Sequence, residues 1–188
     1  MSRTDARIRY TQGVLKQALL SFLQEKPINK ITVQDIVGNC GYSPATFYRN
    51  FSDKFDLIAW DYTTSCREIM NRSAAEGRSW QETVADACRH FQANQDYMCN
   101  LLRNTSGRDS FVRYESAIDA ELISQSILRR TEETDLDENL RHMVTIYSYG
   151  TAQYLCEWLL SDCPLPAAQL AKLFVDALPG QLAAILCK

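Results

Sequence analysis

The sequence predicts an all-α protein in which a small N-terminal helical domain, residues 1–52 (the head), precedes a larger helical domain, residues 53–188 (the body). Three observations favour this fold class. Apolar residues recur through most of the chain at the i, i+3, i+4 and i+7 spacing of a helix face. No segment carries a convincing strand pattern. Seven glycines and five prolines among 188 residues are too few for the many turns of a sandwich or a barrel.

The composition is that of a globular protein, with 46% hydrophobic and 23% charged residues. A chain of this length buries enough surface to fold without a disulfide or a metal ion. The seven cysteines are odd in number and form no Cys-x-x-Cys pair, so we expect reduced, mostly buried thiols. Cysteine and histidine show no zinc-ligand spacing. We therefore expect neither a metal site nor a cofactor.

Membrane insertion, secretion and catalysis are not expected. No apolar run approaches the roughly 20 residues that span a bilayer, and no apolar segment follows the charged N-terminus as in a signal peptide. The sequence lacks a nucleophile elbow, a P-loop, a dinucleotide fingerprint and a His-Glu-x-x-His motif. Histidine is the most common general acid or base in enzymes, and the sequence contains only two histidines. We expect a cytoplasmic protein that is not an enzyme.

Charge is distributed unevenly along the chain. Residues 1–55 hold eight Lys or Arg and four Asp or Glu, whereas the remainder holds twelve basic and nineteen acidic residues. The net charges are therefore +4 and −7, and a basic head on an acidic body suggests that only the first part meets a polyanion. Arg3, Arg7 and Arg9 would form either an arm that contacts DNA or a frayed, solvated terminus.

The head is expected to begin with a helix over residues 7–25, which ends before Pro27 because the residue preceding a proline disfavours the α region. Thr32 is the expected N-cap of a second helix, and Asp35 stands three residues later, where a capping box needs a carboxylate. The apolar residues of this second helix share one face, which predicts that they point inward: Val33, Ile36, Val37 and Cys40.

A tight turn and a third, short helix follow. Gly41 can supply the positive φ of a helix stop, and Ser43 and Pro44 are typical of the N-cap and the first position of a new helix. Phe47 and Phe51 are one turn apart, so both are expected to face the core.

The body is predicted to be helical throughout. Ser52-Asp53-Lys54 would cap a fourth helix that continues to about Arg72. Residues 132–138 are acidic and polar, which is typical of a solvated connection. Further helices are expected over residues 79–104 with a break near Asn94, 109–130, 139–160 and 167–187, the last with room for a kink at Pro179-Gly180.

The second and third helices have the spacing of a helix-turn-helix motif, in which the first helix crosses the DNA backbone and the second enters the major groove. At about 100° per residue, with Phe47 and Phe51 inward, Ala45 and Arg49 fall on the outward face. Spacing alone leaves two interpretations open, a DNA-recognition helix or an ordinary surface helix with a solvated arginine. The residues that flank the outward face supply hydrogen-bonding groups for DNA: Thr46, Tyr48 and Asn50.

A more specific pattern covers residues 31–58. Residues 31–37 read ITVQDIV, and residues 40–58 read CGYSPATFYRNFSDKFDLI. Over roughly residues 7–60, about a third of the chain, the sequence resembles the DNA-binding domain of TetR-family transcriptional regulators. The resemblance implies three N-terminal helices for DNA and a larger helical domain for dimerisation and effector binding.

The resemblance also implies roles for individual residues. Thr32 would bind a phosphate through its hydroxyl and the neighbouring backbone amides. Tyr48 and Lys54 match positions that grip phosphates. The candidate DNA-binding residues are Thr32, Ser43, Pro44, Ala45, Thr46, Tyr48, Arg49, Asn50 and Lys54, of which Pro44, Ala45, Thr46 and Arg49 match the base-facing set.

Three positions depart from the common pattern of the family. Asn50 stands where histidine is frequent, Ala45 where glycine is frequent, and Phe55 where glutamate is frequent. The role of Asn50 is therefore open between reading adenine, donating to a phosphate and capping the helix locally.

The body carries many aromatic residues, which would line a ligand pocket or fill a helical core and a dimer interface. Glu157 is a candidate polar anchor for a ligand. If its helix were rotated slightly, however, Glu157 would lie in solvent. The helices at 139–160 and 167–187 offer apolar surface for dimerisation. The candidate ligand-binding residues are Tyr97, Phe111, Tyr114, Tyr147, Tyr154 and Trp158.

These features together predict a DNA-binding transcriptional regulator, most often a repressor in this family. It would bind a palindromic operator in double-stranded DNA as a homodimer under the control of an unknown small-molecule effector. Two alternatives remain, a transcriptional coactivator controlled by a protein partner and a helical adaptor that binds only proteins.

Overall fold

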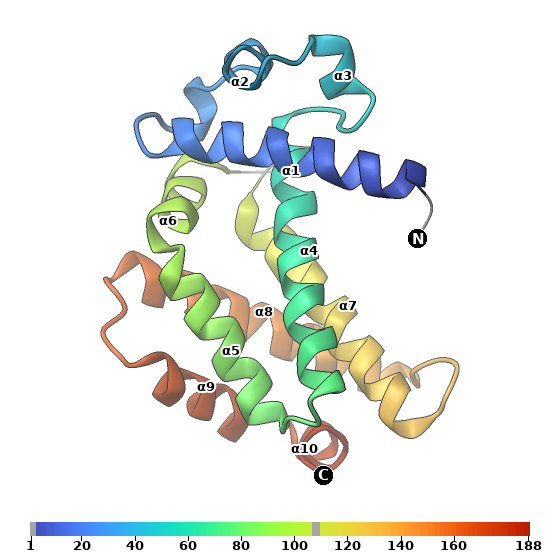
Figure 1. Cartoon of the computed structure of the whole chain (residues 1–188). Helices are drawn as coiled ribbons and strands as arrows, with labels where there is room; N and C mark the ends of the chain where they lie inside the picture. The colour runs from blue at the N-terminus through green and yellow to red at the C-terminus, as the bar shows by residue number, and fades with distance from the viewer. Residues whose placement is uncertain (1–2, 107–109) are drawn as a thin grey trace.

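The computed structural model describes residues 3–106 and 110–188, and every regular element in these ranges is helical (Figure 1). The all-α prediction is therefore confirmed. The elements are α1 (Arg3–Leu23), the 3₁₀ helix η1 (Ile28–Lys30), α2 (Val33–Cys40), α3 (Pro44–Tyr48), α4 (Lys54–Ala75), α5 (Trp80–Ala93), α6 (Gln95–Asn104), α7 (Phe111–Thr131), α8 (Glu138–Leu160), α9 (Ala167–Asp176) and α10 (Gly180–Leu186).

Local capping determines where the helices of the head begin and end. Thr32 and Asp35 form the predicted capping box at the start of α2, and Gly41 ends α2 with a φ of 72°. Ser43 caps α3 by accepting a hydrogen bond from the backbone N–H of Thr46, with Pro44 at the first helical position. Each of these signals lies in the local sequence, which explains why all were predictable.

Four features of the elements differ from the prediction. α1 begins by Arg3, so Arg7 and Arg9 lie within a helix, where both are exposed, and their contact with DNA stays a prediction. α4 continues to Ala75, and η1 was not predicted. The last predicted helix is two helices rather than one kinked helix, because Pro179 adopts an extended ψ of 137° as the N-cap of α10.

The head and the body are joined by α4 (Figure 1). α1 lies across one end of the molecule with α2 and α3 beside it, and α4 runs from there into the body. In the body, α7 packs most extensively against α8, and α5 against α9. Both short C-terminal helices therefore close the end of the body away from the head.

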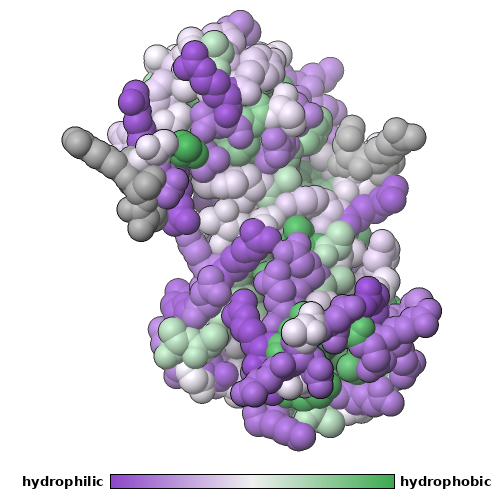
Figure 2. All heavy atoms as spheres, turned by 90° about the vertical axis from the view of Figure 1, so that its right-hand side faces the viewer, coloured by the Kyte–Doolittle hydropathy of each residue, from purple (hydrophilic) through white to green (hydrophobic). Residues whose placement is uncertain are grey.

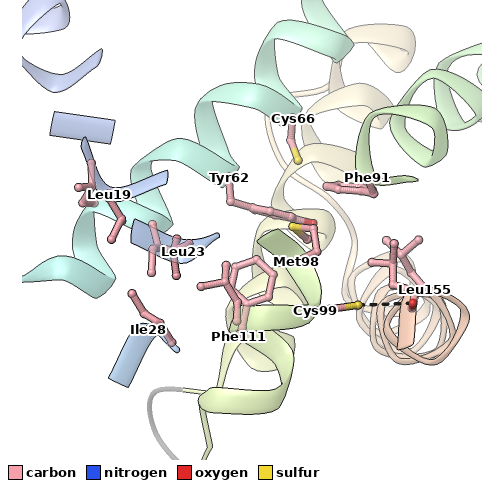
Figure 3. Close-up of a cluster of buried hydrophobic side chains, with 14 of the residues drawn as sticks. Leu19, Leu23, Ile28, Tyr62, Cys66, Phe91, Met98, Cys99, Phe111 and Leu155 are labelled. Carbon is pink, nitrogen blue, oxygen red and sulfur yellow. Dashed lines mark hydrogen bonds between the residues drawn. The ribbon is translucent and has the colours of Figure 1, made fainter. Parts of the chain in front are cut away.

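One hydrophobic cluster extends from the head into the body. Phe47 of α3 and Leu57 of α4 are fully buried in the same cluster as Leu101 of α6. Tyr62 of α4 stacks on Phe91 of α5 at a centroid distance of 5.6 Å (Figure 3). The predicted boundary after residue 52 thus lies where α3 ends and α4 begins, inside a continuous core.

The surface is mostly hydrophilic on the face that Figure 2 shows, and hydrophobic residues reach it only in small separate patches. Within residues 3–106 and 110–188, no helix combines the length and the apolar character needed to cross a membrane. The same ranges contain no group of three or more His, Cys, Asp or Glu side chains placed to hold a metal ion.

Candidate nucleic-acid interface and body cavity

The short helix α3 is fixed on the head by its aromatic residues. The Phe47 side chain is fully buried. Its ring centroid lies 5.6 Å from that of Tyr48, in an edge-on arrangement, and 5.9 Å from that of Phe51. Phe51 in turn contacts Trp60 of α4 at 5.7 Å. These contacts set the rotation of α3 and decide which side chains point away from the protein.

The outward face of α3 carries the side chains that the helical spacing predicted. Ala45 and Arg49 are exposed, and Tyr48 is 59% exposed. Arg49 follows the last residue of α3, but its φ of −76° and ψ of −20° continue the helical path. Thr46 is half-buried, and its hydroxyl lies 3.1 Å from that of Ser43. The predicted outward orientation of Ala45 and Arg49 is confirmed, and their contact with bases stays a prediction.

Asn50 is engaged within the head. Its side-chain amide donates a hydrogen bond of 2.8 Å to the backbone carbonyl of Thr46, four residues earlier. Of the three roles left open by the sequence, the structure shows local capping at the end of α3. To contact a base or a phosphate with this amide, Asn50 would have to release that carbonyl.

The hydroxyl of Thr32 is also already used. It donates to the Asp35 carboxylate at 2.8 Å and accepts from the Asp35 backbone N–H at 3.1 Å. The Thr32 backbone N–H and hydroxyl lower the pKa of the Asp35 carboxyl through their hydrogen bonds, so the carboxylate stays ionised. The first amides of α2, which have no intrahelical acceptor, are the donors best placed for a phosphate.

Lys54 has a role in the head that the sequence did not indicate. Its ammonium donates to the backbone carbonyls of Ile28 at 2.7 Å and Ile31 at 2.6 Å. Burial lowers the pKa of Lys54, although Asp53 and Asp35 nearby oppose this shift. Lys54 therefore ties the start of α4 to η1 and to the residue that precedes Thr32, which leaves one ammonium N–H for a phosphate.

The head is linked to the body by polar contacts. Asn100 of α6 accepts from the Ile28 backbone N–H at 3.0 Å, and its amide donates to the carbonyls of Leu23 and Lys26 at 2.9 Å each. Lys16 of α1 pairs with the buried Asp61 of α4 at 2.6 Å. Movement of α4 or α6 would therefore be transmitted to the segment that positions α2.

A cavity of about 110 Å³ lies inside the body, between α4, α5, α7, α8 and α9. Its wall is mostly apolar and includes the aromatic side chains of Trp80, Phe91, Tyr147 and Phe174. The Tyr147 hydroxyl donates to the Phe174 carbonyl at 2.7 Å, which joins α8 to α9 across the wall. Asp119 supplies a carboxyl group to the same wall.

The six predicted ligand-binding residues do not converge on this cavity. Tyr147 alone among them lines it, whereas Phe111 and Tyr114 border a hollow near the start of α4, and Tyr97 borders another beside α1. Tyr154 is 47% exposed on α8. Trp158 is buried, and its indole N–H donates to the Leu165 carbonyl at 2.9 Å.

Glu157, the candidate polar anchor, is exposed on α8 beside Gln153. The cavity residues absent from the predicted set include Cys66, Trp80, Phe91 and Asp119. Only Asp119 carried a signal, because it is an acidic residue between the apolar positions Ile118 and Leu122 of a predicted helix.

Two carboxyl groups lie one turn apart on α7, the buried Glu115 and the half-buried Asp119. The Glu115 side chain is fully buried and accepts from the Cys156 thiol at 3.2 Å, and Asp119 accepts from the Tyr62 hydroxyl at 3.2 Å. Burial raises the pKa of Glu115 to about 8 and that of Asp119 to about 7. Burial also raises the pKa of the Cys156 thiol, so this thiol stays protonated.

Two family models match the sequence. A model described as bacterial regulatory proteins of the tetR family matches residues 17–59, and a TetR C-terminal model described as transcriptional regulator C-terminal region matches residues 78–180. The second match alone spans more than half of the chain. No curated protein matches the sequence.

Solved structures share the fold over nearly the whole chain. The dihydroxyacetone kinase operon activator DhaS gives a TM-score of 0.66 at 17% identity and covers 94% of this chain and 98% of its own. A TetR transcriptional regulator from Streptococcus agalactiae 2603V gives 0.58 at 23% identity, with coverages of 91% and 94%. FadR from Thermus thermophilus, a TetR-family repressor in complex with lauroyl-CoA, gives 0.57 at 16% identity, with coverages of 89% and 92%.

Proposed function

The chain belongs to the TetR family of transcriptional regulators, and on that premise we propose that it binds a palindromic operator in double-stranded DNA as a homodimer. The observation that carries this proposal is the exposed face of α3, where Ala45, Tyr48 and Arg49 point outward from a helix fixed by the buried Phe47. Members of this family are in general DNA-binding regulators rather than enzymes. We propose that this chain follows them and acts in the cytoplasm.

Within the proposed interface, residues 1–52 form the DNA-binding head and residues 53–188 the dimerisation and effector body. Arg49 and Thr46, with Pro44 and Ala45, would read bases. Tyr48, Lys54 and the amides that follow Thr32 would hold phosphates. The remaining candidates, Ser43 and Asn50, support α3 through its two caps.

Dimerisation is proposed through α8 and α9. Ile146 and Tyr149 on α8 are 74% and 51% exposed, and Leu160 continues the same face. Leu173 adds an exposed apolar side chain on α9. On α8 the exposed Gln153 and Glu157 lie between Tyr149 and Leu160, so the proposed interface is apolar with a polar centre. A two-fold dimer would place its two α3 helices roughly 34–36 Å apart, or at a multiple of that distance, so that both enter major grooves on the same side of the DNA.

Control by a small molecule is proposed for the body cavity. A ligand that prefers the conformation without DNA by tenfold supplies only about 1.4 kcal/mol, so complete release requires a larger preference. Binding in the cavity would move α4 directly and α6 through the preceding helix α5, and the contacts of Asp61 and Asn100 would pass this movement to the head.

The direction of regulation is proposed as repression, which is the most frequent mode in the family. One specific observation favours activation as a second candidate, because the structurally similar DhaS is named an operon activator. The FadR structure, similar over much the same length, is that of a repressor. A transcription assay with the operator placed upstream of a reporter would separate the two, since a repressor lowers and an activator raises the basal signal.

The decisive experiment is selection of bound fragments from random double-stranded DNA, with the oligomeric state measured by light scattering. The proposal expects an enriched palindrome and a dimer at micromolar concentration. A monomer that binds the selected site with unaltered affinity would refute the dimer. Absence of any enriched sequence would favour a helical adaptor that binds only proteins. Operator binding that resists every metabolite pool but changes with an added protein would support the coactivator.

A further inference from the structure

The size of the body cavity limits what it can hold. At about 110 Å³ it is of the same order as the roughly 150 Å³ cavity that accommodates one benzene molecule. A ligand that fits without opening the helices has one ring or a short alkyl chain. Its wall of Trp80, Phe91 and Phe174 favours an apolar body for such a ligand.

The wall also holds a carboxyl group, with a second one behind it, and neither has a positively charged partner. Asp119 lines the cavity, and Glu115 lies one turn behind it, fully buried, with one carboxylate oxygen that has no hydrogen-bond partner. Across residues 3–106 and 110–188, neither carboxyl group forms an ion pair with Lys, Arg or His. Buried carboxylates are normally paired, so this pair is incomplete as it stands.

The groups that face the two carboxyls from neighbouring helices supply no positive charge. They are Tyr62 and Cys66 from α4, Cys88 from α5, and Tyr147 and Cys156 from α8. All five are neutral at pH 7, because burial raises the pKa of each hydroxyl or thiol. Without a ligand, protonation rather than an internal cation keeps these carboxyls largely neutral, and a positive charge that pairs with their ionised form would come from a bound ligand.

A second feature of the wall is its aromatic side chains. Trp80 is only 5% exposed and lines the cavity, and its indole N–H has no acceptor. An ammonium group cannot accept this N–H, so a bound water would be its partner. The faces of Trp80, Phe91 and Tyr147 also attract cations through their π electrons. Carboxylates and aromatic faces together form a typical environment for an ammonium group.

We propose that the body cavity binds a small organic cation, a protonated amine with one ring or a short alkyl chain, whose ammonium pairs with Asp119 and, behind it, Glu115. This inference rests on the proposed function, since it names the ligand class of the effector site. It excludes a ligand whose charged group is an anion, because that group would meet two acidic side chains in an apolar cavity.

Binding of the ammonium is coupled to proton release. In the empty cavity the raised pKa values of about 7 and about 8 keep the two carboxyls partly protonated at neutral pH. The ammonium interacts with the ionised form, so its affinity rises with pH from about 6 to about 8 and levels off above. A neutral ligand of the same shape shows no such rise.

The test is isothermal titration calorimetry on the purified chain without DNA. Three probes of similar shape differ in charge: the cation 2-phenylethylammonium, the neutral 2-phenylethanol and the anion 3-phenylpropanoate. Cyclohexylammonium and butylammonium serve as further cations. We expect an ammonium probe to bind at least tenfold tighter than the neutral and anionic probes. We also expect the heat to depend on the buffer, since protons are released. Equal binding of the neutral probe, preference for the anion, or no binding of any ammonium at millimolar concentration would overturn the inference.

Substitutions on α7 locate the site. Asp119→Asn keeps the shape of the side chain and should lower the preference for ammonium over alcohol at least tenfold. Glu121→Gln, two residues along on the exposed side of the same helix, loses only a surface contact with Arg67 and should keep the preference. Equal preference in the wild type and Asp119→Asn, with both folded by circular dichroism, would place the cation elsewhere and overturn the inference.

A gel shift on the selected operator separates this inference from the proposed function. Ammonium binding that leaves the operator complex intact would refute effector control by this cavity but would support the ligand class. Release of the operator by another class of metabolite, with no ammonium binding, would refute the ligand class and support effector control.

Discussion

In the proposed interface, Arg49 is the residue on which base recognition should most depend, because it is exposed at the end of α3 and its side chain has the bidentate donors that read guanine. We predict that Arg49→Ala costs roughly 1–3 kcal/mol of binding free energy on the cognate operator and relaxes the preference at one or two positions. Fluorescence anisotropy on operators with single base changes measures both effects.

The control for this prediction is Phe47→Ala, which removes a fully buried side chain and should cost about 3–5 kcal/mol of folding free energy together with all DNA binding. If Arg49→Ala instead weakens all sequences equally, Arg49 contacts a phosphate, and the proposed orientation of α3 is wrong.

Lys54 combines a charge with a structural role. As a phosphate contact alone, Lys54→Ala would weaken all DNA sequences about equally and lower the salt slope by about one unit. Because its ammonium also holds the Ile28 and Ile31 carbonyls, we predict an additional loss of about 1–3 kcal/mol in the free energy of unfolding. Urea denaturation measures this loss.

The matched control is Lys30→Ala, which removes an exposed lysine of η1 and should leave the stability within about 0.5 kcal/mol. Unchanged stability in Lys54→Ala would mean that its two hydrogen bonds contribute nothing net, and would return Lys54 to a role in DNA binding alone.

At the scale of elements, Asn100 of α6 holds the segment between α1 and α2, in addition to Lys54 at the start of α4. We predict that Asn100→Ala, which leaves the Ile28 N–H and the carbonyls of Leu23 and Lys26 without this partner, lowers the free energy of unfolding by about 1–3 kcal/mol. Amide hydrogen exchange in residues 24–31 should accelerate.

Asn94→Ala serves as the control, since the Asn94 amide donates only to the nearby His90 carbonyl on an exposed turn. Accelerated exchange confined to α6, with residues 24–31 unchanged, would show that Asn100 does not hold the head to the body.

The elements that could be predicted are those whose signals are local. Thr32 with Asp35, Gly41, and Ser43 with Pro44 each specify a helix boundary within four residues, so α2 and the start of α3 were predicted almost to the residue. The sequence predicted a kink where the structure has a break between α9 and α10. A proline indicates that a helix is disturbed, but it does not indicate whether the helix bends or ends.

The contacts that could not be predicted join residues far apart in the sequence. Lys54 meets Ile28 across 26 positions, and Asn100 meets Leu23 across 77. Tyr154 and Trp158 were candidates on aromatic character alone, and whether a side chain of α8 faces a cavity, the core or solvent depends on how α7 and α9 pack around it. Asp119 was missed for the same reason.

At the scale of the whole molecule, the apolar face of α8 should determine the oligomeric state. We predict that Ile146→Glu, which places a charge on a side chain that is 74% exposed in the protomer, weakens the proposed dimer at least tenfold without unfolding the chain. Sedimentation at graded concentrations measures the dimer dissociation constant. Ala117→Glu, at an exposed position of α7, is the control and should leave it unchanged.

The stability of the whole chain should fall as the pH rises from about 4 to about 8. Glu115 and Asp119 have pKa values of about 8 and about 7 in the folded chain, above the ordinary values of 4.5 and 3.8 that apply after unfolding. Between these limits the folded state binds more protons than the unfolded state, so each increase in pH favours unfolding. Above about pH 8 the penalty is complete, and below about pH 4 it is absent.

Asp119→Asn removes one of the two titrating groups and should make the chain less sensitive to pH. We predict that the variant gains stability relative to the wild type between pH 4 and pH 8, by on the order of 2 kcal/mol. Urea denaturation at a series of pH values measures the difference, and Glu121→Gln is the control because its carboxyl is exposed. A constant difference between Asp119→Asn and the wild type across this range would mean that Asp119 is ionised throughout, with a charge or a water beside it that the packing of α4, α7 and α8 does not provide.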